Sequence, residues 1–215
     1  MSCVTADPTV RTAVSTVREE LSPRRREILS AATTVLAQLG NRGLTHRAVD
    51  RQAGLPEGSS SAYFRTRESL IGALGDFVAD RLAADVEALG ARLATCPGDH
   101  GRAVAEVSLL FSRWLDEPDL LTARLELSVA ATRDPALAER FRRWRDDLVE
   151  MVRGVVAAAD AAAEKPTGAS AETLIAALDG VLLASLLLSP GQRRDFVDQS
   201  VEQLLTGLGP GPAPA

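Results

Sequence analysis

The sequence lacks any long uncharged apolar run, and its N-terminus lacks a basic segment followed by an apolar core. A membrane-spanning helix needs roughly 18 or more apolar residues in a row, and a secretory signal needs a basic segment followed by an apolar core. We therefore expect no membrane span and a cytoplasmic location.

Cysteine and histidine are scarce. The cysteines are Cys3 and Cys96, and the histidines are His46 and His100. Two cysteines, one of them in a polar terminal segment, argue against a structural disulfide and fit a reducing compartment. So few potential ligands also argue against a zinc site. We expect no metal site and no cofactor.

Patterns typical of catalytic sites are missing as well. No Ser-His-Asp set and no glycine-rich phosphate loop can be found, and the run GSSSAYF at 58–64 lacks the Gly-x-Ser-x-Gly arrangement of a nucleophile elbow. We expect no catalytic residues and no enzymatic activity. An enzyme remains the rival hypothesis from a different functional class.

Helix-forming residues dominate what is present. Hydrophobic residues make up 46% and aromatic residues 4% of the 215 residues, alanine and leucine abound, and alternating β-branched runs are scarce. This composition predicts an all-α protein with enough apolar surface for a substantial core. Length alone permits one large domain or two smaller ones.

Charge is divided unevenly along the chain. Segment 22–70 holds eight arginines and four acidic residues, a net charge of +4, and because the whole chain carries −5 the remainder carries −9. A basic segment on an acidic protein indicates that the basic end meets nucleic acid. A chance partition of charge is the alternative.

Three short helices are predicted in this basic segment. The first starts at the Ser-Pro pair 22–23, continues with apolar residues at helical spacing and ends at Gly40. Thr45 caps the second helix and Gly54 stops it, after which the Leu-Pro pair 55–56 imposes a tight turn. Two short helices joined in this way predict a helix-turn-helix.

The third helix is predicted to begin at Pro56 and Glu57 and to enter the major groove, which is about 12 Å wide. Small side chains let the backbone approach the bases, while Phe64 and Leu44 are expected to form the core that holds the three helices together. The alternative is that this Gly-Pro-Ser segment is an ordinary loop. The predicted DNA contacts are Glu57, Ser59 and Ser60 to bases, Ser61 and Tyr63 to sugar or phosphate, and Arg65 and Arg67 to phosphate, with Thr45 and Arg47 from the second helix.

Six further helices are predicted, beginning with a long one capped by Thr66, and these would enclose a ligand cavity. Aromatic and large apolar residues at helical spacing are its candidate walls, although such residues are also typical of an ordinary core. The candidate ligand-binding residues are Phe77, Phe111, Trp114, Leu125, Trp144 and Leu148, with Arg113 and Arg124 as polar anchors for an acidic ligand.

The last two helices, 174–188 and 194–208, are more hydrophobic than the surface of a monomer would accept. They therefore require a partner, unless both are ordinary core helices. The predicted dimer interface consists of Leu174, Leu178, Val181, Leu182, Phe196, Val201, Leu204 and Leu205.

From about Ser22 to Leu74 the chain resembles the DNA-binding domain of the TetR family of one-component transcriptional regulators. The matching positions are Thr45, Ala53-Gly54, Gly58, Tyr63-Phe64, Arg65, Arg67 and Glu68-Ser69-Leu70. Pro56 stands where the family often has a polar cap, and Ser61 where it often has a tyrosine, so the phosphate contact usual at that position passes to Tyr63. Beyond Leu74 the resemblance is architectural and includes the LDGV segment at 178–181.

This resemblance implies a ligand-responsive repressor that binds a palindromic operator as a homodimer, with the last two helices of each subunit forming a four-helix bundle. An unknown small-molecule effector would tilt the long helix and release the double-stranded DNA. The implied domains are an N-terminal arm at 1–21, either disordered or a short amphipathic helix, a helix-turn-helix domain at 22–66, a ligand-binding and dimerisation domain at 67–208, and a disordered tail at 209–215. The alternative is a helical ligand-binding or adaptor protein of the same fold that has lost DNA binding.

Overall fold

The computed structural model of the chain describes residues 21–96, 98–162 and 170–207. Apart from Leu21, the expectations for the arm and the tail lie outside these residues. The described part consists of nine α-helices and no strand, which confirms the all-α prediction. The helices are α1 (Pro23–Gly43), α2 (His46–Gln52), α3 (Ser59–Tyr63), α4 (Arg67–Leu93), α5 (His100–Asp116), α6 (Asp119–Ala131), α7 (Pro135–Ala162), α8 (Ala171–Leu186) and α9 (Pro190–Gly207).

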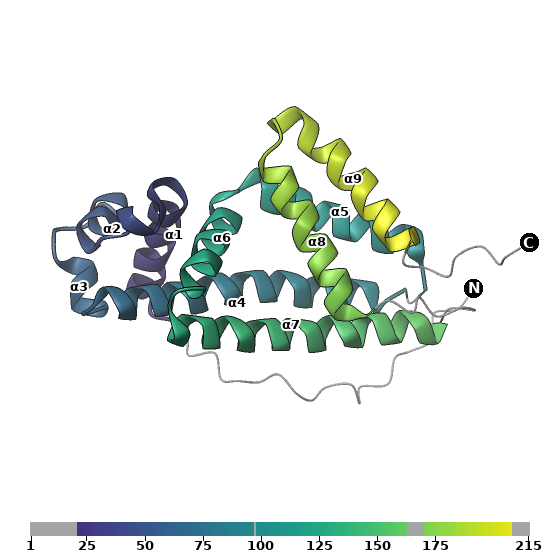
Figure 1. Cartoon of the computed structure of the whole chain (residues 1–215), viewed down its shortest axis with the longest axis horizontal. Coiled ribbons are helices and arrows are strands. Elements are labelled where there is room, and N and C mark those ends of the chain that lie inside the picture. The colour runs from purple at the N-terminus through teal and green to yellow at the C-terminus, as the bar shows by residue number, and fades with distance from the viewer. Residues whose placement is uncertain (1–20, 97, 163–169, 208–215) are drawn as a thin grey trace, which may run out of the picture.

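The molecule is elongated, with a small head at one end and a larger body behind it (Figure 1). Helices α1 to α3 form the head, and α4 runs from the head along the body beside α7. Helix α6 stands next to the head and packs extensively on α1, whereas α5, α8 and α9 pack together farther away. Helices α4 and α6 therefore connect the head to the body.

The head forms as its local sequence predicts. The Ser22 hydroxyl accepts the N–H of Arg25 at 3.4 Å, and Pro23 occupies the first helical turn of α1. Leu44 and Phe64 are buried in the core shared by the three helices, as predicted. The predicted end of α1 at Gly40 is a bend instead, because Gly40 adopts a left-handed φ of 64° and the chain then makes one more turn to Gly43.

Capping residues also set the ends of the body helices. Thr66 and Ser69 form a reciprocal capping box at the start of α4, with both hydrogen bonds at 3.1 Å. Asp134 accepts the N–H groups of Ala136 and Leu137 ahead of α7. The 27 residues of α4 make it about 40 Å long, so this one helix contributes to the cores of both head and body.

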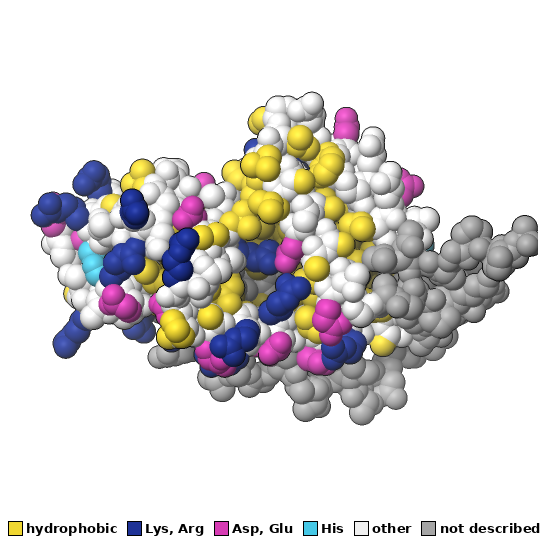
Figure 2. All heavy atoms as spheres, in the orientation of Figure 1, with side chains coloured by type: hydrophobic (Ala, Val, Ile, Leu, Met, Phe, Trp, Pro, Cys, Tyr) yellow, Lys and Arg dark blue, Asp and Glu magenta, His cyan; other side chains and the backbone are white. Residues whose placement is uncertain are grey.

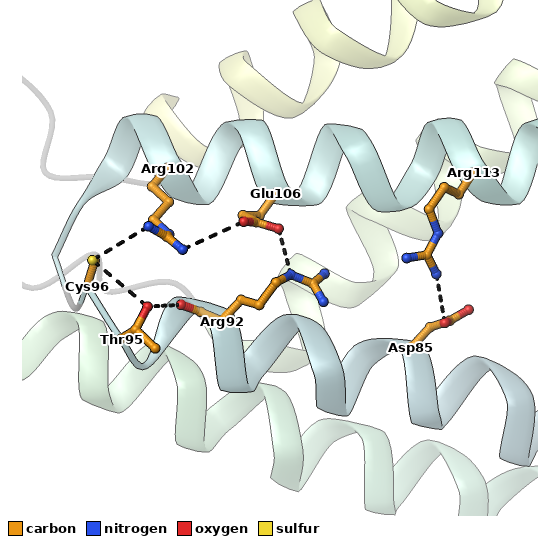
Figure 3. Close-up of polar contacts among 7 residues, drawn as sticks. All are labelled: Asp85, Arg92, Thr95, Cys96, Arg102, Glu106 and Arg113. Carbon is orange, nitrogen blue, oxygen red and sulfur yellow. Dashed lines mark hydrogen bonds and ion pairs between the residues drawn. The ribbon is translucent and has the colours of Figure 1, made fainter. Parts of the chain in front are cut away.

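The body core lies mainly among α5, α8 and α9, where Leu110, Phe111, Leu182, Val197 and Val201 are buried. Ion pairs join α5 to α4 along their length: Asp85 with Arg113 at 2.8 Å, and Arg92 with Glu106 at 2.7 Å (Figure 3). Within the described ranges, no helix combines the length and the apolar character that crossing a membrane requires.

Candidate functional site

The turn between α2 and α3 differs from its prediction in one respect. Gly54 has a φ of 66°, and the N–H of Leu55 donates to the Asp50 carbonyl at 2.8 Å, which gives the expected tight turn. Helix α3 starts at Ser59 and not at Pro56 or Glu57. The reason is Gly58, whose left-handed φ of 91° separates the turn from the helix.

Asp50 holds α3 in place, a role that the sequence reasoning missed. Its side chain is buried, with one carboxylate oxygen accepting the N–H of Gly58 at 2.8 Å and the other that of Ser60 at 2.7 Å. A five-residue helix has unsatisfied N–H groups at its start, and this carboxylate satisfies two of the amides there. The available signal was an acidic residue directly after Val49, in an inward-facing position, ahead of a segment that needed hydrogen-bond acceptors.

The environment of Asp50 keeps it ionised. Burial on its own raises the pKa of this carboxyl, but the hydrogen bonds from Ser60 and from the Gly58 backbone together outweigh burial and lower the pKa below its ordinary value of 3.8. The nearby His46 contributes in the same direction. The head thus contains a buried negative charge whose partners are the amides of the α3 turn.

Ser60 does not lie on the surface of the head. Its side chain is fully buried, and its hydroxyl donates to the His46 carbonyl at 3.2 Å. The prediction that Ser60 contacts bases is therefore wrong, because this serine ties α3 to α2. Ser59 and Ser61 are half-buried, and their hydroxyls donate to the carbonyls of Pro56 and Gly58.

The other predicted residues around α3 remain accessible. Thr45, Arg47, Glu57, Tyr63 and Arg65 are exposed, and Arg47 pairs loosely with Glu57 at 3.4 Å, both side chains being 72% exposed. Figure 2 shows that basic side chains gather on the head, at the end of the molecule that carries α2 and α3. The fold thus places an exposed basic surface around a short helix of small residues.

Arg67 occupies a different environment from Arg65. Its guanidinium donates to the backbone carbonyl of Asn41 and, at 2.7 Å, to the Asn41 side-chain oxygen. The N–H of Asn41 in turn donates to the Glu126 carboxylate of α6 at 3.2 Å. We call Arg67, Asn41 and Glu126 the junction chain, because it links α4 through the end of α1 to α6.

The predicted ligand walls belong to separate clusters of packed side chains in the described structure. Phe77 belongs to the core that α4 shares with the head, Phe111 stacks on Trp114 in the core of α5, α8 and α9, and Leu148 packs in a third cluster. Trp144 fills the space beside Gly75 of α4, where a methyl group would meet its ring. These side chains pack at separate helix crossings, which periodicity cannot distinguish from the lining of a cavity.

The predicted polar anchors are both engaged in ion pairs. Arg113 pairs with Asp85, which also accepts the Trp114 indole N–H at 2.8 Å. Arg124 makes two 2.9 Å hydrogen bonds to the two carboxylate oxygens of Asp179. A pocket of about 370 Å³ lies elsewhere, at the junction of α3, α4 and α7, and none of the predicted ligand-binding residues line it.

The predicted dimer residues divide into two groups. Val181, Leu182 and Val201 are buried in the core of their own chain, so their assignment to a surface is wrong. The cause is that α8 is apolar on several sides, and α5 packs on the sides of α8 and α9 on which these residues lie. The partly buried group consists of Leu174, Leu178, Phe196, Leu204 and Leu205, whereas Leu183 and Leu187, which were not predicted, are 47% and 83% exposed.

Comparisons with known proteins agree with this architecture. The family model described as "Tetracyclin repressor-like, C-terminal domain" matches residues 98–211. A solved member of the TetR family from Streptomyces coelicolor A3 is 31% identical, with 88% of this chain and 99% of that chain covered and a TM-score of 0.65. The multidrug binding protein EbrR, solved with imidazole, is 30% identical over 90% of this chain and 94% of its own, with a TM-score of 0.60.

More distant structures share the fold. A putative TetR-family transcriptional regulator from Mesorhizobium loti is 20% identical, with 86% of this chain and 96% of that chain covered and a TM-score of 0.68. A search of curated proteins gave no match.

Proposed function

Because this chain belongs to the TetR family of transcriptional regulators, we propose that it is a repressor that binds a palindromic operator as a homodimer and is released by a small-molecule effector. The head would bind the DNA and the body would bind the effector and the second subunit. Two-fold symmetry would place two α3 helices about one DNA turn apart, or slightly more.

The observation that carries this proposal is the way the head presents α3. Buried Asp50 and Ser60 fix the start of the helix, so its orientation is set before any DNA arrives. Around it lie exposed groups that suit DNA, with Arg47 and Arg65 for phosphates and Glu57 for a cytosine amine. Tyr63, 42% exposed, is available for the backbone contact that Ser61 is too short to make.

Pairing of two subunits through α8 is supported by a stripe of exposed small and apolar residues. Ala176, Gly180, Leu183 and Leu187 follow one another at helical spacing, and all four are exposed. The space beside Gly180 is open, so a second backbone can approach closely there. We propose this stripe as the centre of the dimer interface, in place of the residues that the fold buries.

Communication between the two parts would run through α4 and α6. Helix α4 begins in the head and continues through the body, and the junction chain fixes α6 to the end of α1 and to the first residue of α4. An effector that binds one arrangement of these helices more tightly than another changes DNA affinity reciprocally. Arg67 is therefore assigned to the head–body junction as well as to the predicted phosphate contact.

The proposal is tested by fluorescence anisotropy with labelled DNA from upstream of the protein's own gene. We expect Arg65→Ala to weaken binding to all sequences and to flatten the dependence of log affinity on log salt concentration by about one unit per lost phosphate contact. The matched control is Arg142→Ala, an exposed arginine of α7 in the body, which should leave both quantities unchanged.

Three results would contradict these assignments. An unchanged salt slope for Arg65→Ala would remove this residue from the DNA surface. An equal effect of Arg142→Ala would show that the loss of affinity reflects net charge and not a local contact with DNA. If the wild-type protein bound no duplex of any sequence in dilute buffer, the function would instead be that of a helical ligand-binding or adaptor protein.

A further inference from the structure

Two arginines from two helices of the body meet at one carboxylate from a third helix. Asp179 of α8 receives two 2.9 Å hydrogen bonds from Arg124 of α6, and Arg145 of α7 approaches the same carboxylate at 3.5 Å. The cluster therefore holds two guanidinium groups and one carboxylate. Its net charge is +1, and one further monoanion would neutralise it.

This cluster spans a space that the helices leave open. Helix α6 packs mainly on α1, α4 and α7, and α8 packs mainly on α7 and α9. Helix α5 contacts both, but α6 and α8 themselves make few contacts with each other. Figure 2 shows the surface hollowed between these two helices, with charged side chains inside the hollow and hydrophobic ones along its borders. An ion pair between two helices that make few other contacts does little to hold those helices together, but its charged groups are well placed to bind a ligand.

Solvent can reach the cluster, although the groups are partly desolvated. The side chains of Arg124, Asp179 and Arg145 are 28%, 31% and 45% exposed. In the described part of the chain, Asp179 is the one acid within ion-pair distance of Arg145, and at 3.5 Å this guanidinium has donors to spare. Partial desolvation strengthens a charge-assisted hydrogen bond to an incoming anion.

We propose that Arg124 and Arg145 bind the carboxylate of an amphipathic organic anion, which takes the place of Asp179 on the two guanidiniums while its apolar part fills the hollow. This inference rests on the proposed function, since the anion would be the effector or a member of its chemical class. Arg124 lies two residues from Glu126 on α6, so a ligand that frees Arg124 from Asp179 acts on the same helix that holds the junction chain.

The test uses the full-length protein without DNA and isothermal titration with two carboxylates, decanoate and 2-naphthoate. Each is compared with its uncharged amide, which has nearly the same shape. We expect at least one of the carboxylates to bind, and its amide to bind at least tenfold more weakly. If neither carboxylate binds, or if acid and amide bind equally, the proposal is overturned.

Two substitutions with opposite expected effects identify the site. Asp179→Asn removes the competing carboxylate and should tighten binding of the carboxylate severalfold, whereas Arg124→Gln should weaken it at least tenfold. Arg92→Gln is the matched control, because it breaks another pair of an arginine and a carboxylate between helices, Arg92 with Glu106, and should change nothing. Weaker binding by Asp179→Asn would overturn the proposal even if Arg124→Gln failed to fold.

DNA binding is then measured separately, so that the two proposals can fail independently. Release of labelled DNA by the bound carboxylate would support both of them. A carboxylate that binds through Arg124 to a protein with no affinity for DNA would leave the anion site intact and overturn the proposed function. DNA binding without any carboxylate binding would overturn the anion site and leave the proposed function intact.

Discussion

At the scale of single residues, the head depends on buried polar groups more than on its exposed ones. Asp50 and Ser60 are buried, yet they determine where the backbone of α3 lies. A carboxylate that accepts two amide hydrogen bonds is stable in this site only while it is charged and both donors are present. The five-residue helix α3 therefore depends on a residue of the preceding helix.

Removing the Asp50 carboxylate should destabilise the head. Asp50→Ala leaves the N–H groups of Gly58 and Ser60 without an acceptor, and we expect a loss of about 1–3 kcal/mol in the free energy of unfolding, measured by urea denaturation. DNA affinity should fall as well. Asp50→Asn keeps one acceptor oxygen and should lose less.

The same pair of variants predicts a pH dependence. Because the folded-state pKa of Asp50 is lowered, its contribution to stability is fully present above the unfolded-state value and declines as the pH falls through the folded-state pKa, below 3.8. The stability difference between wild type and Asp50→Asn should therefore be constant near neutral pH and shrink in acid. A difference that grew on acidification would refute this assignment.

At the scale of elements, α6 is one of the helices that connect the head to the body. It packs on α1 of the head, its Glu126 accepts a hydrogen bond from Asn41, and its Arg124 reaches α8. Gly40 is required where α1 meets α6, because its φ of 64° is unfavourable for other residues. A displacement of α6 must therefore move the end of α1 or break this contact.

Glu126 and Arg67 should be energetically coupled through Asn41, to which each of them is hydrogen-bonded. Both contact Asn41, so the effects of Glu126→Ala and Arg67→Ala on DNA affinity should be non-additive by about 0.5–1.5 kcal/mol in a double-mutant cycle. The control cycle pairs Glu126→Ala with Arg142→Ala and should be additive. Additivity in the first cycle would mean that the junction chain carries no coupling.

At the scale of the whole molecule, the arrangement of α8 and α9 explains which apolar surface remains for a partner. Their inner sides complete the core with α5, and the outer side of α8 is left with Leu183 and Leu187. An exposed leucine stripe on one side of an otherwise satisfied helix indicates an interaction surface. The two-fold assembly of the proposed function would cover it.

Leu187→Glu should therefore separate the subunits without unfolding them. Burying an unpaired carboxylate costs several kcal/mol, so the dimer dissociation constant should rise on the order of 100-fold or more, as measured by light scattering over a concentration series. The control is Leu109→Glu, at an exposed leucine of α5. Leu182→Glu should unfold the protein instead, because Leu182 belongs to the core. An unchanged dimer in Leu187→Glu would place the pairing surface elsewhere.

The sequence by itself determined the features that depend on near neighbours in the chain. Helix caps and turns act over about four residues, so local patterns were sufficient to predict the caps at Ser22, Thr45 and Thr66 and the turn at Gly54. The composition of the chain was sufficient to predict the all-α fold class. The core positions of Leu44 and Phe64 were also predicted from the sequence.

Only the tertiary structure decided which side of each helix faces inward and which distant side chains meet. Val181 and Leu182 are buried because α5 packs against that side of α8. Since α8 is apolar on several sides, the spacing of its apolar residues does not indicate which side faces the core. The contact of Glu126 with Asn41 joins residues 85 positions apart. Such contacts depend on how whole helices pack, and packing is a property of the assembled chain and not of any local segment.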